Sequence, residues 1–117
     1  MVNSKQKGNR AERALADTLS EMTGLTVRRN LQSRDGGSNN PDIAGIEGLH
    51  IEVKHVEKLN IWNALEQALT DCKGAIPVVF FKRNRTPWNI AVQLDYTEAF
   101  CVHFLEALGW QCVKEGA

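Results

Sequence analysis

The sequence predicts a single mixed α/β domain with its elements in the order helix, three strands, helix, two strands and helix (αβββαββα). Three observations support this order. Apolar residues recur at helical spacing between residues 11 and 22, polar and apolar residues alternate strictly over 50–55, and an almost continuous apolar run covers 76–81. A chain of 117 residues is long enough to bury one core. We therefore expect residues 1–117 to form one domain.

The first expected element is a helix from about residue 5 to 22, which Gly24 would end. A short strand that carries arginines is expected next, over residues 25–31. Residues 32–41 are rich in Gly, Ser and Asn, so we expect them to form a loop.

A hairpin and a second helix are expected in the middle of the chain. A strand over 42–46 would pass through a tight turn at 47–48 into the alternating strand at 50–55. Asn60 can cap a helix that runs to Cys72, because its side chain can accept a bond from a free backbone N–H. The predicted apolar face of this helix consists of Ile61, Leu65, Ala68, Leu69 and Cys72.

The last third of the chain is expected to add two strands and a helix. The apolar run at 76–81 is typical of a buried strand, and residues 88–94 form another strand pattern. Asp95 and Glu98 have the spacing of a capping box, which predicts a final helix that ends at Leu108.

Composition is that of an ordinary globular protein, with 43% hydrophobic and 24% charged residues. The N-terminus has no apolar signal sequence and no apolar run is long enough to cross a bilayer, so an intracellular, cytoplasmic location is expected. The cysteine count is odd, at three, and no C-x-x-C pair occurs. This pattern favours neither a disulfide framework nor a zinc site.

Charge is distributed unevenly although the formal net charge is zero. Residues 1–40 carry seven basic and four acidic residues, a net charge of +3, whereas the remainder carries seven basic and ten acidic residues, a net charge of −3. A solvated surface explains such scatter by itself, and the asymmetry favours a nucleic-acid partner only slightly.

The strand at 50–55 holds the residues that suggest chemistry. Neighbouring side chains on a strand point to opposite faces, so Glu52 and Lys54 face one way and Ile51 and Val53 the other. The hairpin would bring the Asp42 carboxylate towards Glu52. Two close carboxylates repel unless a cation lies between them, and hard oxygen ligands suit Mg²⁺. A lysine on the same face can orient a water or neutralise charge on a phosphate, as phosphodiester hydrolysis requires.

A structural explanation of the same residues has about equal weight. A solvent-exposed hairpin often carries a Glu–Lys pair on its outer face, and such pairs contribute about 0–1 kcal/mol. P-D and E-x-K are each weak signals when they occur alone. Here P-D-I is followed by E-V-K across a glycine-containing turn, and nine residues separate Asp42 from Glu52.

Together these motifs resemble the signature of the PD-(D/E)XK nuclease superfamily. The chain contains Pro41-Asp42 and then Glu52-Val53-Lys54, and its opening K-G-N-R-A-E-R-A-L over residues 7–15 resembles that of archaeal-type Holliday junction resolvases and related phage enzymes. The resemblance covers about residues 5–95. It implies a restriction-endonuclease-like α/β (α+β) fold, in which helices flank a mixed β-sheet.

The resemblance also implies roles for individual residues. Asp42 and Glu52 would bind Mg²⁺, with Mn²⁺ as a substitute, and the Val53 carbonyl would be a further ligand. Lys54 would be the catalytic lysine. Glu12 matches the helical glutamate that completes such sites, and it lies about 100° round the helix from Ala11, at the edge of the apolar stripe.

DNA is the partner that the resemblance implies, in the form of branched four-way junctions, without a membrane or a small-molecule cofactor. Ser33 and Ser38 lie in the loop where such resolvases keep a functional serine, and the sequence does not choose between them. Gln67 receives little weight because it lies off the apolar face of its helix. The three tryptophans are expected to be core or interface anchors rather than platforms for base stacking. The basic residues expected to contact phosphates are Lys5, Lys7, Arg10, Arg13, Arg34, Lys82, Arg83 and Arg85.

The resemblance further implies a homodimer, because symmetric cleavage of two strands needs two active sites. The expected function is a metal-dependent, structure-selective endonuclease, in particular a Holliday junction resolvase. Two alternatives stay open: a nuclease that acts on single-stranded, nicked, flapped or site-specific DNA, and a non-catalytic nucleic-acid-binding module. The candidate residues for the dimer surface are Phe100, Phe104, Leu108 and Trp110.

Overall fold

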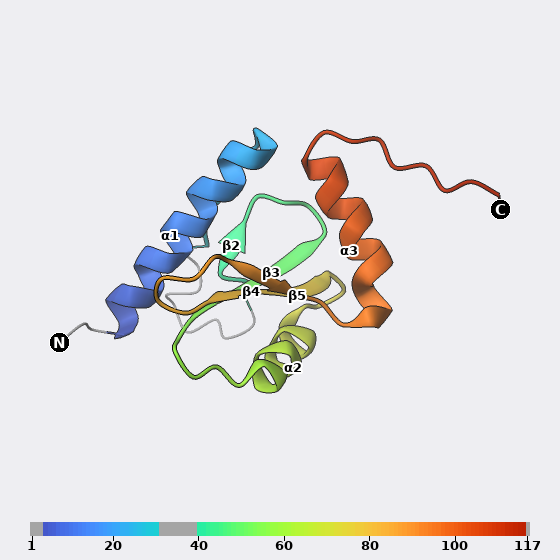
Figure 1. Ribbon diagram of the computed structural model, residues 1–117. Coiled ribbons are helices and arrows are strands. Elements are labelled where there is room, and N and C mark those ends of the chain that lie inside the picture. The colour runs from blue at the N-terminus through green and yellow to red at the C-terminus, as the bar shows by residue number, and fades with distance from the viewer. Residues whose placement is uncertain (1–3, 31–39, 117) are drawn as a thin grey trace.

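A computed structural model describes residues 4–30 and 40–116. In this part of the chain, α1 (Ser4–Thr23) and α3 (Leu94–Ala107) cover one face of a β-sheet, and α2 (Ile61–Asp71) covers the other face (Figure 1). The predicted order αβββαββα is confirmed. None of the described helices is long and apolar enough to cross a membrane.

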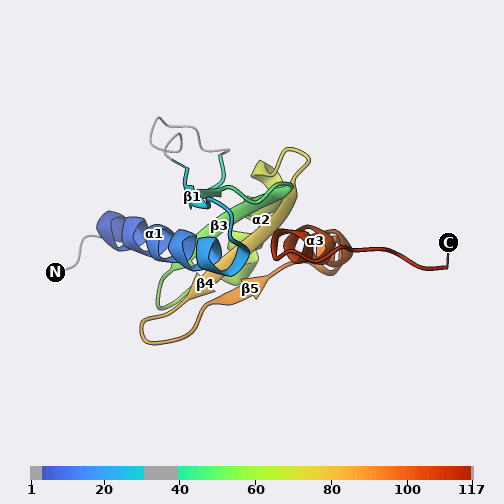
Figure 2. The ribbon, with the colours of Figure 1, turned by 90° about the horizontal axis from the view of Figure 1, so that it is seen from above.

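The sheet contains five described strands, and their order in space is their order in the sequence. The central pair, β3 and β4, is parallel, and α2 makes the crossover between them. The other pairs are antiparallel. The strand order places β1 and β5 at the two edges of the sheet (Figure 2). The strands are β1 (Arg28–Arg29), β2 (Ile43–Ala44), β3 (Leu49–His55), β4 (Ile76–Lys82) and β5 (Asn89–Ala91).

Two apolar layers hold the sheet between its helices. On the α1 and α3 side, Leu15 packs with the inward-facing Ile51 and Val78, and all three are at most 1% exposed. On the α2 side, Ala64 and Ala68 pack against Val79. The strict alternation along β3 therefore sends its apolar residues to the α1 side and its polar residues to the α2 side.

Three strands are shorter than predicted: 25–31 is reduced to β1, 42–46 to β2 and 88–94 to β5. At β2 the physical reason is Gly45, whose φ of 121° departs from strand geometry. Beyond β5, Gln93 is the N-cap of α3, so the chain turns into the helix at Leu94.

The helix ends show one correct and one wrong prediction. Asn60 caps α2 as predicted, because its side-chain oxygen accepts a bond of 3.2 Å from the Asn63 backbone N–H. The capping box at the start of α3 is wrong, because the N-cap is Gln93 and makes no side-chain cap bond. Glu98 instead forms an exposed ion pair of 2.9 Å with Lys114.

The predicted buried face of α2 is also partly wrong. Leu69 is 37% exposed, whereas Ala64 and Asp71 are buried. The small side chains at Ala64 and Ala68 let the helix lie close to the sheet, and this rotates the buried stripe relative to the prediction.

Two glycines with positive φ shape the β2–β3 hairpin. Gly45 has a φ of 121°, and a Cβ built there would overlap the Thr26 carbonyl oxygen and the Val27 backbone. Gly48 has a φ of 85°, and a Cβ there would overlap the ring of His103 on α3. The hairpin is thus in close contact with its neighbours at both positions, which only glycine permits.

Candidate active site

The side of β3 that faces α2 carries three polar side chains, those of His50, Glu52 and Lys54. Glu52 is 3% exposed, and its Oε1 lies 2.8 Å from Nε2 of the equally buried His50. Lys54 is half-buried, and its Nζ donates a bond of 3.2 Å to Oε1 of Gln67 on α2. The glutamate and the lysine are therefore each held by a neighbouring side chain.

The hairpin places Asp42 next to Glu52. Ile43 pairs with Ile51 across the antiparallel strands, so Asp42 lies opposite Glu52 in the register. The Asp42 N–H donates to the Ile51 carbonyl at 2.8 Å, and Asp42 Oδ2 accepts a bond of 2.8 Å from the Val53 N–H. Both bonds fix the carboxylate over the start of β2, as the hairpin prediction required.

Burial and neighbouring carboxylates both disfavour the charged form of Asp42. Burial raises the pKa of Asp42 to about 8, with the negative charges of Glu52 and Glu12 adding to the effect and the Val53 N–H opposing it. Like charges held close together in a partly dry place favour a bound proton or a cation between them. The pair thus has the chemistry of a cation site.

Glu12 reaches this cluster from α1. Its Oε2 accepts a bond of 2.8 Å from Nε of Arg29 on β1, and both side chains are largely buried. Nη2 of the same arginine donates to Asn9 Oδ1 at 2.9 Å. Arg29 therefore fixes Glu12 at the edge of the cluster, close enough for its charge to act on Asp42. We call Glu12, Asp42 and Glu52 the acidic cluster.

The donor set fits a hard divalent cation that keeps water ligands. Within the described residues, no group of three or more His, Cys, Asp or Glu side chains is arranged as a ready-made metal cage. Mg²⁺ is commonly held by one or two carboxylates together with waters and substrate phosphates. The close pair of Asp42 and Glu52, with its raised pKa, meets that requirement.

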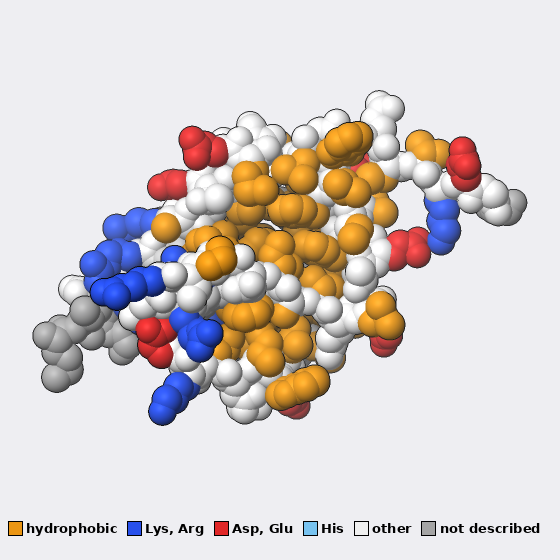
Figure 3. Space-filling view, in the orientation of Figure 1, with side chains coloured by type: hydrophobic (Ala, Val, Ile, Leu, Met, Phe, Trp, Pro, Cys, Tyr) orange, Lys and Arg blue, Asp and Glu red, His pale blue; other side chains and the backbone are white. Residues whose placement is uncertain are grey.

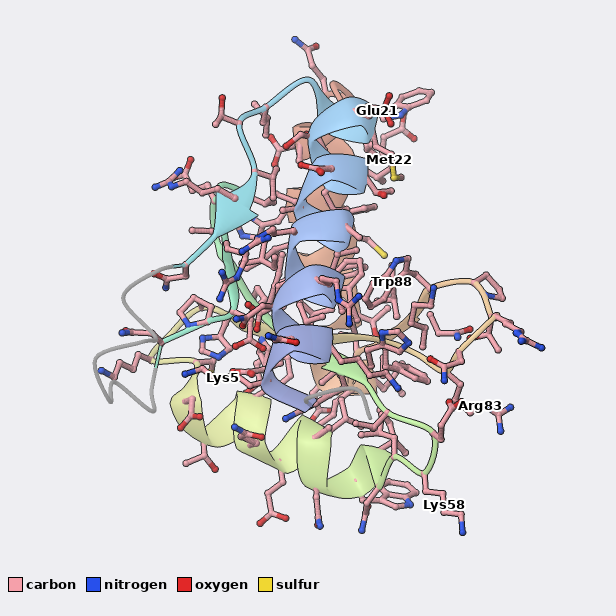
Figure 4. The ribbon with its side chains drawn as sticks, turned by 90° about the vertical axis from the view of Figure 1, so that its left-hand side faces the viewer. Lys5, Glu21, Met22, Lys58, Arg83 and Trp88 are labelled. Carbon is pink, nitrogen blue, oxygen red and sulfur yellow. The ribbon has the colours of Figure 1, made fainter. Side chains whose placement is uncertain are left out.

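The opposite flank of α1 carries a different surface, which we call the Trp88 groove. It is a hollow of about 670 Å³, and none of the described residues that line it is acidic. Figure 4 shows Trp88 and Arg83 on one side of α1 and Lys5 on the other. The residues that line the groove are Lys7, Arg10, Ala11, Ala14, His55, Lys82, Asn84 and Trp88.

Short-range contacts order the wall of the groove. Nζ of Lys82 lies 5.5 Å from the centroid of the Trp88 ring, and Nε2 of His55 lies 3.0 Å from Oδ1 of Asn84. Burial lowers the pKa of His55; the bond to Asn84 opposes this effect, and the positive charges of Lys7 and Lys82 add to it. Two lysine charges thus act on His55 from the groove, and the negative charge of Glu57 opposes them.

The predicted phosphate-binding residues do not lie together. Lys7, Arg10 and Lys82 line the Trp88 groove, whereas Arg13, Arg83 and Arg85 are exposed outside it. Figure 3 shows basic side chains gathered at the end of the molecule where α1 begins. The residues Ser33, Arg34 and Ser38, which were also predicted to contact DNA, lie outside the described residues.

Three residues that contact the site were either not predicted from the sequence or given little weight there. Gln67 reaches Lys54 because it lies off the apolar face of α2. His50 could have been noticed, since it lies two residues before Glu52 and therefore on the same strand face. Arg29 carries no such signal, because its contact with Glu12 spans 17 residues.

Comparisons with known proteins agree with this geometry. A family model described as "Phage putative PDDEXK endonuclease" matches residues 3–109. A solved structure of Hjc, a Holliday junction resolvase from the archaeal hyperthermophile Archaeoglobus fulgidus, is 30% identical with a TM-score of 0.52, and the match covers 72% of this chain and 70% of that one. No curated protein gave a match. The predicted restriction-endonuclease-like fold is thereby confirmed.

Proposed function

Because this chain belongs to the family of phage PD-(D/E)XK endonucleases, we propose that it is a metal-dependent, structure-selective DNA endonuclease, and more specifically a Holliday junction resolvase. The observation that carries the proposal is the pair of the half-buried Asp42 and the buried Glu52, with Lys54 on the same face of β3 as Glu52. Residues 1–117 would act as one nuclease domain.

The chemistry is assigned to this chain's own residues. Asp42 and Glu52 would hold the divalent cation, Mg²⁺ or its substitute Mn²⁺, with the Val53 carbonyl as a further ligand. Such a cation supplies Lewis-acid activation of the phosphate and of a bound water. Lys54 would orient the water or neutralise charge that develops on the phosphate, and Gln67 holds its ammonium group in place. Glu12 would complete the cluster from α1.

Selection of DNA by its structure follows from the size and the charge pattern of the chain. A chain of 117 residues leaves little room for the loops that read base edges in a major groove. Lysines and arginines bind phosphates without reading sequence. In this proposal the basic residues named in the sequence hold the arms of a branched DNA.

A homodimer is part of the proposal, because two nicks related by symmetry need two active sites. Figure 3 shows hydrophobic side chains gathered between α1 and α3, a surface to which the half-buried Phe100 and Phe104 contribute with rings stacked 5.4 Å apart. Phe104→Asp should convert the dimer to a monomer in light scattering. A dimer mass that the substitution leaves unchanged would exclude this surface.

The function is tested by cleavage of a labelled four-way DNA junction, with matched duplex and single-strand controls, in Mg²⁺, Mn²⁺ and EDTA. The proposal predicts paired symmetric nicks on the junction, and their loss in EDTA. Cleavage of the linear or single-stranded controls would support nuclease activity but assign it a DNA substrate other than the junction. Tight binding without cleavage in either metal would contradict the catalytic assignment.

A further inference from the structure

We propose that the Trp88 groove binds an unpaired nucleotide of the DNA, with its base against Trp88 and its phosphates held by the surrounding lysine and arginine side chains. This site would favour DNA in which the duplex is interrupted. The inference rests on the proposed function only for the identity of the ligand as DNA. It departs from the sequence prediction, in which Trp88 is a core or interface anchor.

The shape of the groove suits one nucleotide. Its volume of about 670 Å³ lies within the range of pockets that take small organic ligands, about 300–1,000 Å³. Ala11 and Ala14 contribute only methyl groups to it, and the half-buried ring of Trp88 adds an apolar surface. A planar base can occupy such a space, whereas a duplex cannot enter it.

The charge of the groove suits a phosphodiester backbone. Lys7 and Arg10 come from α1 and Lys82 comes from the end of β4, so positive charge approaches the groove from two elements. None of the described lining residues is acidic. Cations around a polyanion release its counterions, which gives affinity that falls steeply with salt.

Pairing of the DNA decides which nucleotides can enter. In a duplex the bases are stacked inside, and a protein reaches only phosphates, sugars and base edges. An unpaired base can leave the stack and lie against an aromatic side chain, and this contact tolerates any base. A base can therefore stack against Trp88 only where the DNA strand is unpaired.

The position of the groove connects it to the acidic cluster. Lys54 faces the α2 side of β3, and the next residue, His55, lines the groove. Consecutive strand residues are about 3.3 Å apart along the strand and point to opposite faces, so the two sites adjoin at the end of β3 from opposite sides of the sheet. A DNA strand that passes round the end of β3 can therefore place one phosphate at the acidic cluster and a nearby nucleotide in the groove.

The first experiment makes Trp88 the only tryptophan. Trp62 and Trp110 are 78% and 67% exposed, so replacing both with Phe disturbs little packing. In EDTA, a single-stranded oligonucleotide and a duplex with a flap should quench Trp88 fluorescence on binding, and a blunt duplex should not. Labelled DNA reports binding in parallel. Failure to bind the single strand, binding without quenching, or equal quenching by blunt duplex overturns the proposal.

The second experiment measures affinity. Trp88→Leu should weaken single-strand binding by about fivefold or more, with blunt-duplex binding changed less than about twofold. Since Trp88 also packs against the core, Lys82→Gln provides an independent test at the rim, where the salt slope for single strands should fall by about 0.7. The control is Lys114→Gln, because Lys114 is exposed and forms an ion pair of 2.9 Å with Glu98 at the C-terminal end of the chain, away from the groove. An equal loss in the control, or no loss at Lys82, overturns the proposal.

The same DNA molecules distinguish failure of the groove proposal from failure of the proposed nuclease function. Cleavage by the wild-type protein in Mg²⁺ is measured on the same DNA molecules. Cleavage without Trp88 quenching refutes the groove and leaves the nuclease in place. Quenching by unpaired DNA without cleavage supports the groove and refutes the catalytic function.

Discussion

The two flanks of α1 present opposite kinds of surface. On the β1–β2 side, Glu12, Asp42 and Glu52 form a largely buried acidic cluster in which hydrogen bonds of 2.8 Å fix each carboxylate. On the β4–β5 side, Lys7 and Lys82 line a positively charged groove. The first surface holds carboxylates that short hydrogen bonds fix in place, and the second holds long cationic side chains.

The difference separates chemistry from substrate holding. Rigid, partly dry acids suit a cation and a reaction that demands exact placement, because their repulsion is relieved only when positive charge is bound. Long cationic side chains suit a backbone that has many equivalent positions. If this division is correct, substitutions on the acidic flank should change cleavage rates, and substitutions on the basic flank should change affinity.

The largest expected effect is at Asp42. Asp42→Asn should reduce cleavage to background, because the pair with Glu52 loses a negative ligand, while DNA binding should stay within about threefold since no groove residue changes. Single-turnover cleavage and DNA anisotropy measure the two properties. Asp95→Asn, at an exposed position of α3, is the matched control. A large loss of binding in Asp42→Asn would break the proposed division between the flanks.

Lys54 should follow with a large effect on rate alone. Lys54→Met removes a charge positioned by Gln67 and should lower the single-turnover rate at saturating DNA by at least about 100-fold. Lys58→Met, four residues further on and exposed, should cut DNA at the wild-type rate. Equal rates for the two variants would remove Lys54 from the chemistry.

Arg29 sharpens the comparison because it is a basic residue on the acidic flank. Arg29→Gln should slow cleavage by about tenfold, since Glu12 loses the partner that holds it near Asp42. Affinity for DNA should change little, as expected of a positioning residue. The neighbouring, exposed Arg28→Gln is the control at saturating DNA. The opposite pattern, weaker binding at an unchanged rate, would make Arg29 a phosphate contact.

The smallest expected effect is on thermal stability. Because the folded-state pKa of Asp42 is raised from 3.8 to about 8, the folded protein binds an extra proton between these values, and its free energy of unfolding falls as pH rises from about 4 to about 8. Asp42→Asn imitates the protonated acid. In EDTA it should melt about 4 °C or more above the wild type at pH 8, and the gain should shrink towards pH 4. A gain that is independent of pH would refute this origin, and Asp95→Asn should show none.

The acidic flank was far more predictable from the sequence than the basic flank. Period-two alternation over 50–55 and a hairpin with glycine in its turn were enough to bring Asp42 opposite Glu52 and to set Lys54 beside it. These contacts are local, so a strand pattern determines them. The roles assigned to these residues stay predictions until cleavage is measured.

The Trp88 groove depends on segments that are far apart in the chain. Lys7, His55, Lys82 and Trp88 meet only because β3 and β4 pair in parallel and α1 packs over them. No periodicity in the sequence encodes such a meeting. The same limit explains the misplaced cap of α3, where Glu98 is engaged by Lys114 rather than by the start of its own helix.

The two glycines of the β2–β3 hairpin limit which residues the sequence can carry at positions 45 and 48. A side chain at Gly45 would push β2 away from the backbone of Thr26 and Val27, and one at Gly48 would displace His103 of α3. A shift of β2 would move Asp42, and both glycines have a positive φ that other residues rarely adopt, although neither glycine touches a reacting group. Selection for cleavage from a library randomised at positions 45 and 48 should therefore return glycine at both, whereas the exposed positions 58 and 114 should accept many residues.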